Sequence, residues 1–126
     1  MHHFSNIIQS FKEMYRILKP HGKLIISDPT PNENDSCQFV DKYMQVKPDG
    51  HIRFYRLNEY QKMLDKVGFR FISNQVTSIR FPRKEVEKYS EIIRKTDKNI
   101  LLGYQIEIQG DEIWVTERVL NMIFCR

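Results

Sequence analysis

Two short stretches of the sequence carry side chains suited to acid–base chemistry. His2 and His3 stand just before a helix-forming segment, and Asp28 ends an apolar run that Pro29 and Thr30 follow. An imidazole titrates near neutral pH, so a histidine held beside a reactant can act as a general base. Open α/β sheets bind ligands beyond the carboxyl ends of their strands, which is where Asp28 is expected. We therefore take His3 and Asp28 as candidate catalytic residues.

Both candidates also have a structural interpretation. A histidine at the start of a helix can simply cap it or pack against it, and this is the simpler explanation for His2 or His3. Asp28 can hydrogen-bond the loop that follows it. For Asp28 the functional and the structural interpretations both stay open.

The elements that must position these residues begin with a helix. Ser5 is the expected N-cap, because its hydroxyl can accept a hydrogen bond from a free amide of the first turn. Pro20 cannot continue the helix. Apolar residues recur at steps of three and four and form one stripe: Phe4, Ile7, Ile8, Phe11, Met14, Tyr15 and Leu18.

A strand is predicted at residues 23–28, after a turn that Gly22 permits. Leu24, Ile25 and Ile26 form a continuous apolar run. A run without alternation is typical of a strand that is covered on both faces in a parallel sheet. Helix, tight turn and buried strand together indicate an α/β layer.

Residues 30–56 are predicted to form a loop and a short helix. The loop is rich in proline, asparagine and aspartate. Asp35 or Ser36 is expected to cap the helix. One side of this helix is apolar and can pack on the sheet, through Phe39, Val40, Tyr43 and Met44.

A second amphipathic helix is predicted over residues 59–67. Asn58 and Gln61 fit a capping box, and Gly68 fits the helix terminator. The apolar positions are spaced i, i+3, i+4 and i+7, at Tyr60, Met63, Leu64 and Val67. Leu64 lies in the middle of this stripe and is expected to be fully buried.

The rest of the chain alternates between strand and helix patterns. Residues 69–81 are predicted to be extended, with Pro82 at the end, and residues 84–95 carry a helical stripe. Gly110 marks a hairpin turn. Residues 119–124 are almost continuously apolar, which predicts a strand buried on both faces.

The composition limits the class of protein. A chain of 126 residues is predicted to form one domain, and its 40% hydrophobic and 29% charged residues are ordinary for a globular protein. No apolar run approaches the about 20 residues that a membrane span needs. No secretory leader is visible, so we expect a cytoplasmic protein without a membrane partner.

Charge and cysteine usage exclude two further classes. The net charge is +4, but the cations of residues 83–98 are interleaved with acidic residues. Interleaved charges are typical of a solvated helix face, so no nucleic-acid partner is expected. Cys37 and Cys125 are far apart and are expected to be reduced thiols. The histidines do not stand at metal-ligand spacings, so no metal site is predicted.

The start of the chain resembles a known family. Its His-His-Phe, a helix with Glu13 and Arg16, Leu-Lys-Pro-x-Gly-Lys-Leu and a strand ending in Asp28 are similar to the second half of a class I S-adenosylmethionine-dependent methyltransferase. The nearest type is the small-molecule enzyme of ubiquinone and menaquinone biosynthesis. Residues 66–69 resemble the family's late helix leading into its sixth strand. His21 departs from the pattern, which usually has a second glycine there.

The resemblance implies a fold class. We expect an α/β protein that is the C-terminal half of a Rossmann-like methyltransferase sheet, with strands five to seven and their flanking helices. The N-terminal cofactor-binding half would be missing. The single partial domain would comprise a helix and central strand (1–29), a candidate substrate lid (30–56), and a helix plus antiparallel strand region (57–126).

The resemblance also implies site residues. The cofactor S-adenosylmethionine would lie near the residues that follow the fourth strand: His2, His3 and Phe4. A small-molecule methyl acceptor would lie against the end of the fifth strand and the lid: Asp28, Pro29, Thr30, Phe39 and Tyr43. For the last two, packing of a helix on the sheet stays the simpler alternative.

The family's cofactor site begins with a glycine-rich loop, and no Gly-x-Gly occurs here. The five glycines are isolated from one another. We therefore expect this chain to be inactive alone and to bind no cofactor by itself. The alternative is a non-catalytic α/β module that associates with itself or a partner. An in-frame Gly-x-Gly loop in the DNA upstream of Met1 would discriminate between the two.

A half sheet would also have an open edge. Strand 23–28 would keep residues 119–124 as one neighbour and leave its other edge unpaired. Unpaired N–H and C=O groups beside apolar side chains are a template for pairing with another chain. We therefore expect a homo-oligomer through strand 23–28.

Overall fold

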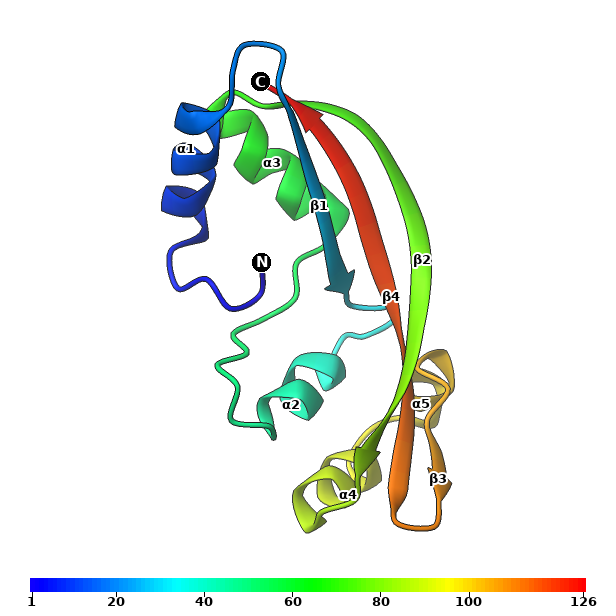
Figure 1. Ribbon diagram of the computed structural model, residues 1–126. Helices are drawn as coiled ribbons and strands as arrows, with labels where there is room; N and C mark the ends of the chain where they lie inside the picture. Colours follow the sequence, from blue (N-terminus) through cyan, green and yellow to red (C-terminus); the bar gives the residue numbers. More distant parts are fainter.

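The computed structural model describes all 126 residues of the chain. The strands form one sheet in the order β1-β4-β2, and the short β3 pairs with β4 (Figure 1). The elements are, in chain order, α1 (Ile7–Ile17), β1 (Lys23–Thr30), α2 (Phe39–Gln45), α3 (Leu57–Val67), β2 (Arg70–Lys84), α4 (Glu87–Arg94), α5 (Lys98–Gly103), β3 (Glu107–Gln109) and β4 (Glu112–Cys125).

β4 is the central strand, and all of its pairings are antiparallel. Lys23 pairs with Cys125 and Thr30 with Arg118, so residues 119–124 are the neighbour of β1, as predicted. β1 and β2 run in the same direction, but β4 lies between them. The parallel pairing expected for β1 is therefore absent, and β1 has one open edge.

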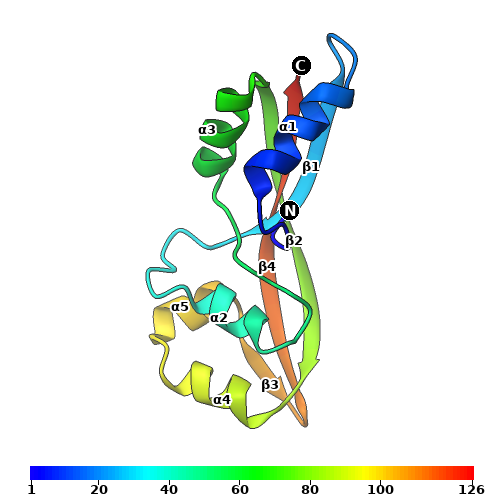
Figure 2. The same cartoon turned by 90° about the vertical axis from the view of Figure 1, so that its left-hand side faces the viewer.

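The helices α1, α3 and α2 lie on one side of the sheet (Figures 1 and 2). α1 and α3 contact each other over the part of the sheet that contains β1. α2, α4 and α5 gather around the far ends of β2 and β4. The N-terminus of the chain lies beside the end of β1 in both views.

The sheet is covered on one face along β1. Ile26 is 4% exposed, whereas its neighbour Ile25 is 69% exposed. The prediction that this strand is covered on both faces was wrong, because the helices pack on one side only. The same correction applies to residues 119–124, where buried and half-exposed positions alternate.

The first helix begins one residue later than the sequence suggested. The side-chain Oδ1 of Asn6 accepts a hydrogen bond from the backbone N–H of Gln9 at 3.1 Å, so Asn6 and not Ser5 is the N-cap. Ile7 and Phe11 are the buried residues of the predicted apolar stripe. The rest of the stripe is less completely covered, because only α3 and the sheet pack against it.

The capping of α3 also differs from the prediction. The carboxylate of Glu59 accepts a hydrogen bond from the backbone N–H of Arg56 at 2.8 Å. The cap therefore involves Arg56 and Glu59, two residues before the predicted pair Asn58 and Gln61. The helix ends as predicted at Gly68, which has a φ of 111° that other residues rarely adopt.

β2 extends beyond the proline that was expected to end it. Pro82 pairs with Trp114, and the strand continues to Lys84. A proline is tolerated at this position because β2 is an edge strand, whose outer N–H groups need no partner in the sheet.

The N-cap position of α2 is Gln38, with a left-handed φ of 58°, and not Asp35 or Ser36, but the Asp35 carboxylate does cap the first turn. Both carboxylate oxygens of Asp35 accept backbone hydrogen bonds, from Phe39 at 2.7 Å and from Val40 at 3.0 Å. All four apolar residues of this helix are buried. No helix of the chain combines the length and the apolar character of a membrane span.

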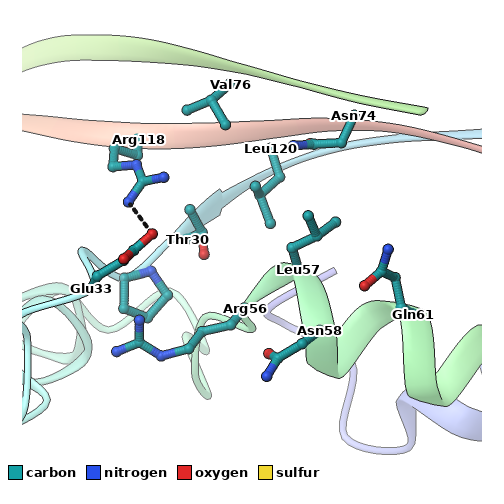
Figure 3. A pocket seen from close by; sticks show the side chains of 11 residues that line it. Thr30, Glu33, Arg56, Leu57, Asn58, Gln61, Asn74, Val76, Arg118 and Leu120 are labelled. Carbon is teal, nitrogen blue, oxygen red and sulfur yellow. Dashed lines mark ion pairs between the residues drawn. The ribbon is translucent and has the colours of Figure 1, made fainter.

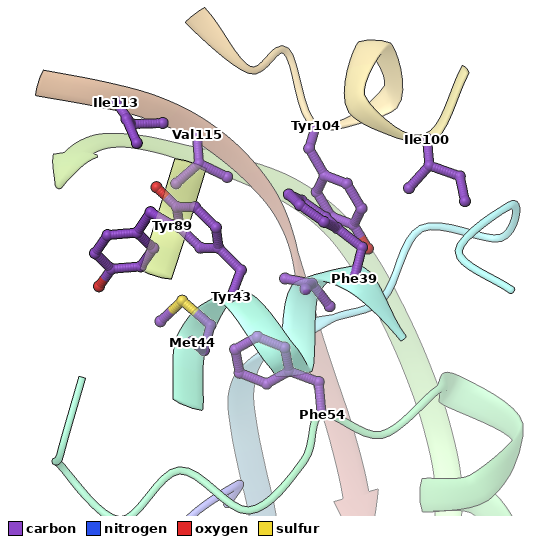
Figure 4. Close-up of a cluster of buried hydrophobic side chains, with 10 residues drawn as sticks. Phe39, Tyr43, Met44, Phe54, Tyr89, Ile100, Tyr104, Ile113 and Val115 are labelled. Atoms are coloured by element: carbon purple, nitrogen blue, oxygen red, sulfur yellow. The ribbon is translucent and has the colours of Figure 1, made fainter. Parts of the chain in front are cut away.

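Two hydrophobic clusters stabilise the fold. The first lies between α1, α3 and the sheet, around Phe11, Leu64 and Met122. The second lies between α2, α4, α5 and the far end of β4, around Phe39 and Tyr43 (Figure 4).

The buried polar residues lie in the segments that join the two clusters: the end of β1, the loops after β1 and before α3, and the middle of β4. We call them the polar seam: Asp28, Thr30, Asn32, Asp35, His51 and Glu117. Burying a polar group is costly unless it is hydrogen-bonded. The polar seam is therefore the first place to look for a functional site.

Candidate active site

Asp28 is the centre of the hydrogen-bonded groups at the end of β1. Its Oδ1 is 2.9 Å from Nδ1 of His2 and 3.0 Å from the amino group of Met1. Its Oδ2 accepts a hydrogen bond from the Tyr60 hydroxyl at 2.7 Å. The side chains of Asp28 and Tyr60 are almost completely buried. β1 and α3 thus hold the carboxylate against the start of the chain.

The surroundings keep Asp28 ionised. Burial opposes ionisation, but hydrogen bonds, above all those from His2 and Tyr60, outweigh it and hold the pKa of Asp28 below its usual value. Burial, and then the charge on Asp28, raise the pKa of Tyr60, so this hydroxyl stays a donor.

An ionised Asp28 fixes the tautomer of His2. A carboxylate can only accept, so Nδ1 of His2 must carry the proton of the 2.9 Å bond. Nε2 of the neutral ring is then an unprotonated acceptor on the opposite side. This is the arrangement in which a carboxylate orients a histidine for proton abstraction.

A second carboxylate–histidine pair lies next to the first. Oδ1 of Asp41 is 2.8 Å from Nε2 of His51 and also accepts the backbone N–H of Phe54 at 2.7 Å. His51 is buried, and its Nδ1 has no hydrogen-bond partner. α2 therefore positions an imidazole whose free nitrogen faces the interior.

Three imidazole rings meet at this place. The ring of His2 has its centre 4.2 Å from that of His3 and 5.3 Å from that of His51. The rings of His3 and His51 are 6.2 Å apart. No group of three His, Cys, Asp or Glu side chains is arranged to hold a metal ion. Through His2, which is bonded to Asp28, these rings adjoin the end of β1.

Glu117 adds a third acidic group to the polar seam. Its side chain is 2% exposed, and its Oε1 has no hydrogen-bond partner. Burial raises the pKa of Glu117 to about 7. Arg83 and His51 lower this pKa, but by less. Asp41 and Asp28 raise it further, so Glu117 is electrostatically linked to both carboxylate–histidine pairs.

The other predicted site residues lie in different surroundings. Phe4 is 44% exposed and lies outside both clusters. Thr30 donates its hydroxyl hydrogen bond to the backbone carbonyl of Tyr55 at 3.0 Å. Phe39 and Tyr43 are completely buried in the second hydrophobic cluster. Figure 4 shows the ring of Tyr43 beside Tyr89 of α4 and that of Phe39 beside Tyr104, which follows α5. The hydroxyl of Tyr43 is buried without a partner.

A polar cleft of about 600 Å³ lies beside the polar seam. Figure 3 shows it between the first turn of α3 and the strands β2 and β4. Thr30 lines it, together with Arg56 and an ion pair in which Arg118 lies 3.8 Å from Glu33. Of the predicted acceptor residues, only Thr30 lines this cleft.

Four residues of the site were not predicted from the sequence: His51, Asp41, Tyr60 and Glu117. One signal for Glu117 was present, because it continues the alternation of Ile113 and Val115 at a position where an apolar residue is expected. A carboxylate on the buried face of a strand needs a partner or a function. No comparable signal marked His51, which stands in an irregular connection.

Two solved structures share this fold. A protein from Bacillus halodurans C-125 that is described as a methyltransferase aligns with a TM-score of 0.81 at 23% identity, over 98% of this chain and 59% of that one. The YcgJ protein of Bacillus subtilis aligns with a TM-score of 0.77 at 18% identity, over 99% of this chain and 59% of that one. The fold is therefore that of an α/β methyltransferase.

The sequence places the chain in a family. The model of the methyltransferase domain family matches residues 1–74, and the chain belongs to this family. The uncharacterized methyltransferase YcgJ of Bacillus subtilis (strain 168) is 30% identical over 63 residues, which are 49% of this chain and 25% of that protein. The resemblance to class I methyltransferases is thus confirmed. The chain spans a quarter of this curated relative and 59% of the two solved structures.

Proposed function

We propose that this chain supplies the acceptor side of an S-adenosylmethionine-dependent methyltransferase that acts on a small molecule. The observation that carries the proposal is the Asp28–His2 pair at the carboxyl end of β1, in a chain of the methyltransferase family. In open α/β sheets ligands bind at such strand ends. Family membership does not favour the alternative of a non-catalytic module.

In this proposal His2 is the general base. Asp28 holds Nδ1 protonated, which leaves Nε2 free to take the proton from a hydroxyl or amine of the acceptor. The proton moves to His2 as the acceptor atom bonds to the methyl group. Tyr60 supports the pair by donating to the other oxygen of Asp28. The roles given to His3 and Asp28 from sequence thus become those of a neighbouring ring and an orienting carboxylate.

The residues around His2 fit one side of a cofactor site. S-adenosylmethionine supplies an electrophilic methyl group when bound. His2 is bonded to Asp28 at the end of β1 and His3 lies against His2, so in this proposal both can contact the sulfonium end of the cofactor. The exposed side chain of Phe4 follows them in the sequence. A glycine-rich loop for the rest of the cofactor is not present in the sequence. We therefore propose that the cofactor site is completed only within a longer domain, of which this chain is the C-terminal half.

Isothermal titration of the purified chain with S-adenosylmethionine tests this incompleteness. We expect no binding in the low-micromolar range. Such binding would show that the chain builds a cofactor site without the glycine loop. A chain extended by the in-frame coding sequence upstream of Met1 should bind the cofactor and transfer its methyl group to a small molecule.

Two matched variants of the extended chain test the base. His2→Asn should lower kcat by about 10²–10⁴-fold, the usual contribution of a general base. His21→Asn is the control, because His21 is exposed and its φ of 64° suits asparagine. Equal activity of the two variants would contradict the role of His2.

A further inference from the structure

The cleft beside the polar seam carries more positive than negative charge. Two of its 11 lining residues are arginines, Arg56 and Arg118, and one is acidic, Glu33. A guanidinium group keeps its charge in a protein, and its N–H groups match the two oxygens of a carboxylate. The charge of the cleft therefore favours a ligand with an anionic group.

The charge of Arg56 is not neutralised by an ion pair within the chain. The carboxylate of Glu59, which lies three residues further along the chain, is bound instead by the guanidinium of Arg53 and by the backbone N–H of Arg56. Arg56 is also half-buried. Its guanidinium group is therefore free to bind an anion in the cleft.

The charge of Arg118 is only weakly neutralised. Its guanidinium lies 3.8 Å from the carboxylate of Glu33, whose side chain is 87% exposed. An ion pair of this length at an exposed position contributes little to stability. A ligand carboxylate can therefore replace Glu33 at small cost.

Thr30 lies between the two arginines. In the register of β1 and β4 it pairs with Arg118. Its hydroxyl donates to the backbone carbonyl of Tyr55, the residue before Arg56, at 3.0 Å. Arg118 and Arg56 therefore flank the same residue at the end of β1.

The first turn of α3 adds two donors to the cleft. The N–H groups of Glu59 and Tyr60 both donate to the carbonyl of Arg56. The N–H groups of Leu57 and Asn58, the first two residues of the helix, bond to no group of the chain. The positive end of the helix thus acts in the same direction as the arginines.

The rest of the cleft is apolar apart from side-chain amides. In Figure 3 the side chains of Leu57 and Leu120 point toward each other across the cleft, and Val76 adds to the apolar wall. Asn74 also lines the cleft, and its Oδ1 is buried without a hydrogen-bond partner. Such atoms are rare in folded proteins, so Asn74 is an independent indication that a polar ligand completes the site.

We propose that this cleft is a binding site for a small carboxylic acid. Its carboxylate lies between Arg56 and Arg118, and its apolar body packs against the leucines and the valine of the wall. Leu120 pairs with Asp28 in the register of the two strands, so the bound acid lies next to the candidate active site. The binding site does not depend on the role proposed for His2.

Two probes of nearly equal shape test the charge requirement without any cofactor. Phenylacetate is an anion, and phenylacetamide is its neutral analogue. Titrations of the ¹⁵N-labelled chain are followed by the Nε–Hε resonances of the arginine side chains. We expect phenylacetate to bind and to shift the resonances of Arg56 and Arg118. Phenylacetamide should bind at least about tenfold more weakly, because it lacks the charge-assisted hydrogen bonds.

Matched variants test the residues. Arg118→Gln and Arg56→Gln should each weaken phenylacetate binding by at least about tenfold and leave phenylacetamide binding unchanged. Glu33→Gln should strengthen phenylacetate binding by about two- to fivefold, because it removes the competing carboxylate. Arg94→Gln is the control, since Arg94 forms a comparable exposed ion pair with Glu87 on α4, outside the cleft. It should leave the binding of both probes unchanged.

The titrations of the wild type and of the variants each decide the proposal. Equal affinity for phenylacetate and phenylacetamide would overturn it, as would unchanged phenylacetate binding by Arg118→Gln or Arg56→Gln. The absence of phenylacetate binding at about 10 mM would also overturn it. An equal loss of binding in Arg94→Gln would mean that only the net charge of the chain attracts the anion. None of these measurements uses the cofactor or His2, so the binding site and the proposed function can fail separately.

Discussion

The raised pKa of Glu117 makes a quantitative prediction about stability and pH. Burial raises this pKa from the ordinary value of 4.5 to about 7. The folded protein therefore binds a proton that the unfolded chain has already lost between these two values. The protonation of Glu117 therefore adds to the free energy of unfolding; this contribution is fully present below pH 4.5 and is lost as the pH rises through about 7. A difference of about 2.5 in pKa corresponds to about 3 kcal/mol.

Glu117→Gln removes this titration and keeps the size of the side chain. From pH 5 to pH 8 the wild-type free energy of unfolding should fall by about 2.5 kcal/mol relative to that of the variant. Urea denaturation followed by the fluorescence of Trp114, the one tryptophan of the chain, measures both proteins. The comparison at each pH cancels the titration of other groups that are common to both.

Four groups interact electrostatically with Glu117, and these interactions must be the same in both proteins: those with Arg83 of β2, His51, Asp41 of α2 and Asp28 of β1. Identical near- and far-ultraviolet circular dichroism of the two proteins would establish this. A constant difference in unfolding free energy across this pH range would refute the reasoning. It would mean that Glu117 ionises in the folded state as easily as in water.

Two further predictions concern the core and the edge of the sheet. Leu64→Ala should destabilise the chain by about 2–5 kcal/mol in chemical denaturation, because Leu64 is completely buried, whereas Leu102→Ala, at a side chain 73% exposed, should cost less than about 0.5 kcal/mol. A similar decrease in the free energy of unfolding for both variants would mean that the hydrophobic cluster under α3 contributes little to stability. The open edge of β1 and the exposed Ile25 should make the chain self-associate at micromolar concentration, and Ile25→Lys should reverse this. Sedimentation of the wild type as a monomer would contradict the homo-oligomer.

Most of the elements were predictable because their signals are local. The spacing of Tyr60 and Leu64 fixed the buried face of α3, and Gly68 fixed its end. Asp35 identified the carboxylate that caps the first turn of α2, although the helix begins only at Phe39, after Gln38 at the N-cap position. The capping residues were the least reliable, since Asn6 and Ser5 are equally good caps by residue type and only the path of the chain decides between them.

Burial and the site depend on contacts between distant segments. The continuous apolar run Leu24–Ile26 is typical of a strand with two buried faces. Whether a face is buried depends on the elements that pack against it, and here helices pack against one face only. The Asp28–His2 pair joins residues 26 positions apart, and Asp28–Tyr60 joins residues 32 apart. The family resemblance named His2 for the cofactor and Asp28 for the acceptor, but their contact, and the places of His51 and Tyr60, became visible only in the folded chain.

The place of the site follows from an irregularity in β4. Along this strand Ile113, Val115 and Glu117 are buried at odd positions, but Leu120 and Met122 are buried at even ones. The buried positions Glu117 and Leu120 are three residues apart, and this step interrupts the alternation. Because the long strand twists, its first half packs in one hydrophobic cluster and its second half in the other. Glu117 stands on one side of this step, and Asp28 of β1 pairs with Leu120 on the other. The polar seam therefore lies between the two hydrophobic clusters. Glu117 is the last buried residue of β4 before the step, so its position in the strand places its carboxyl group in the seam.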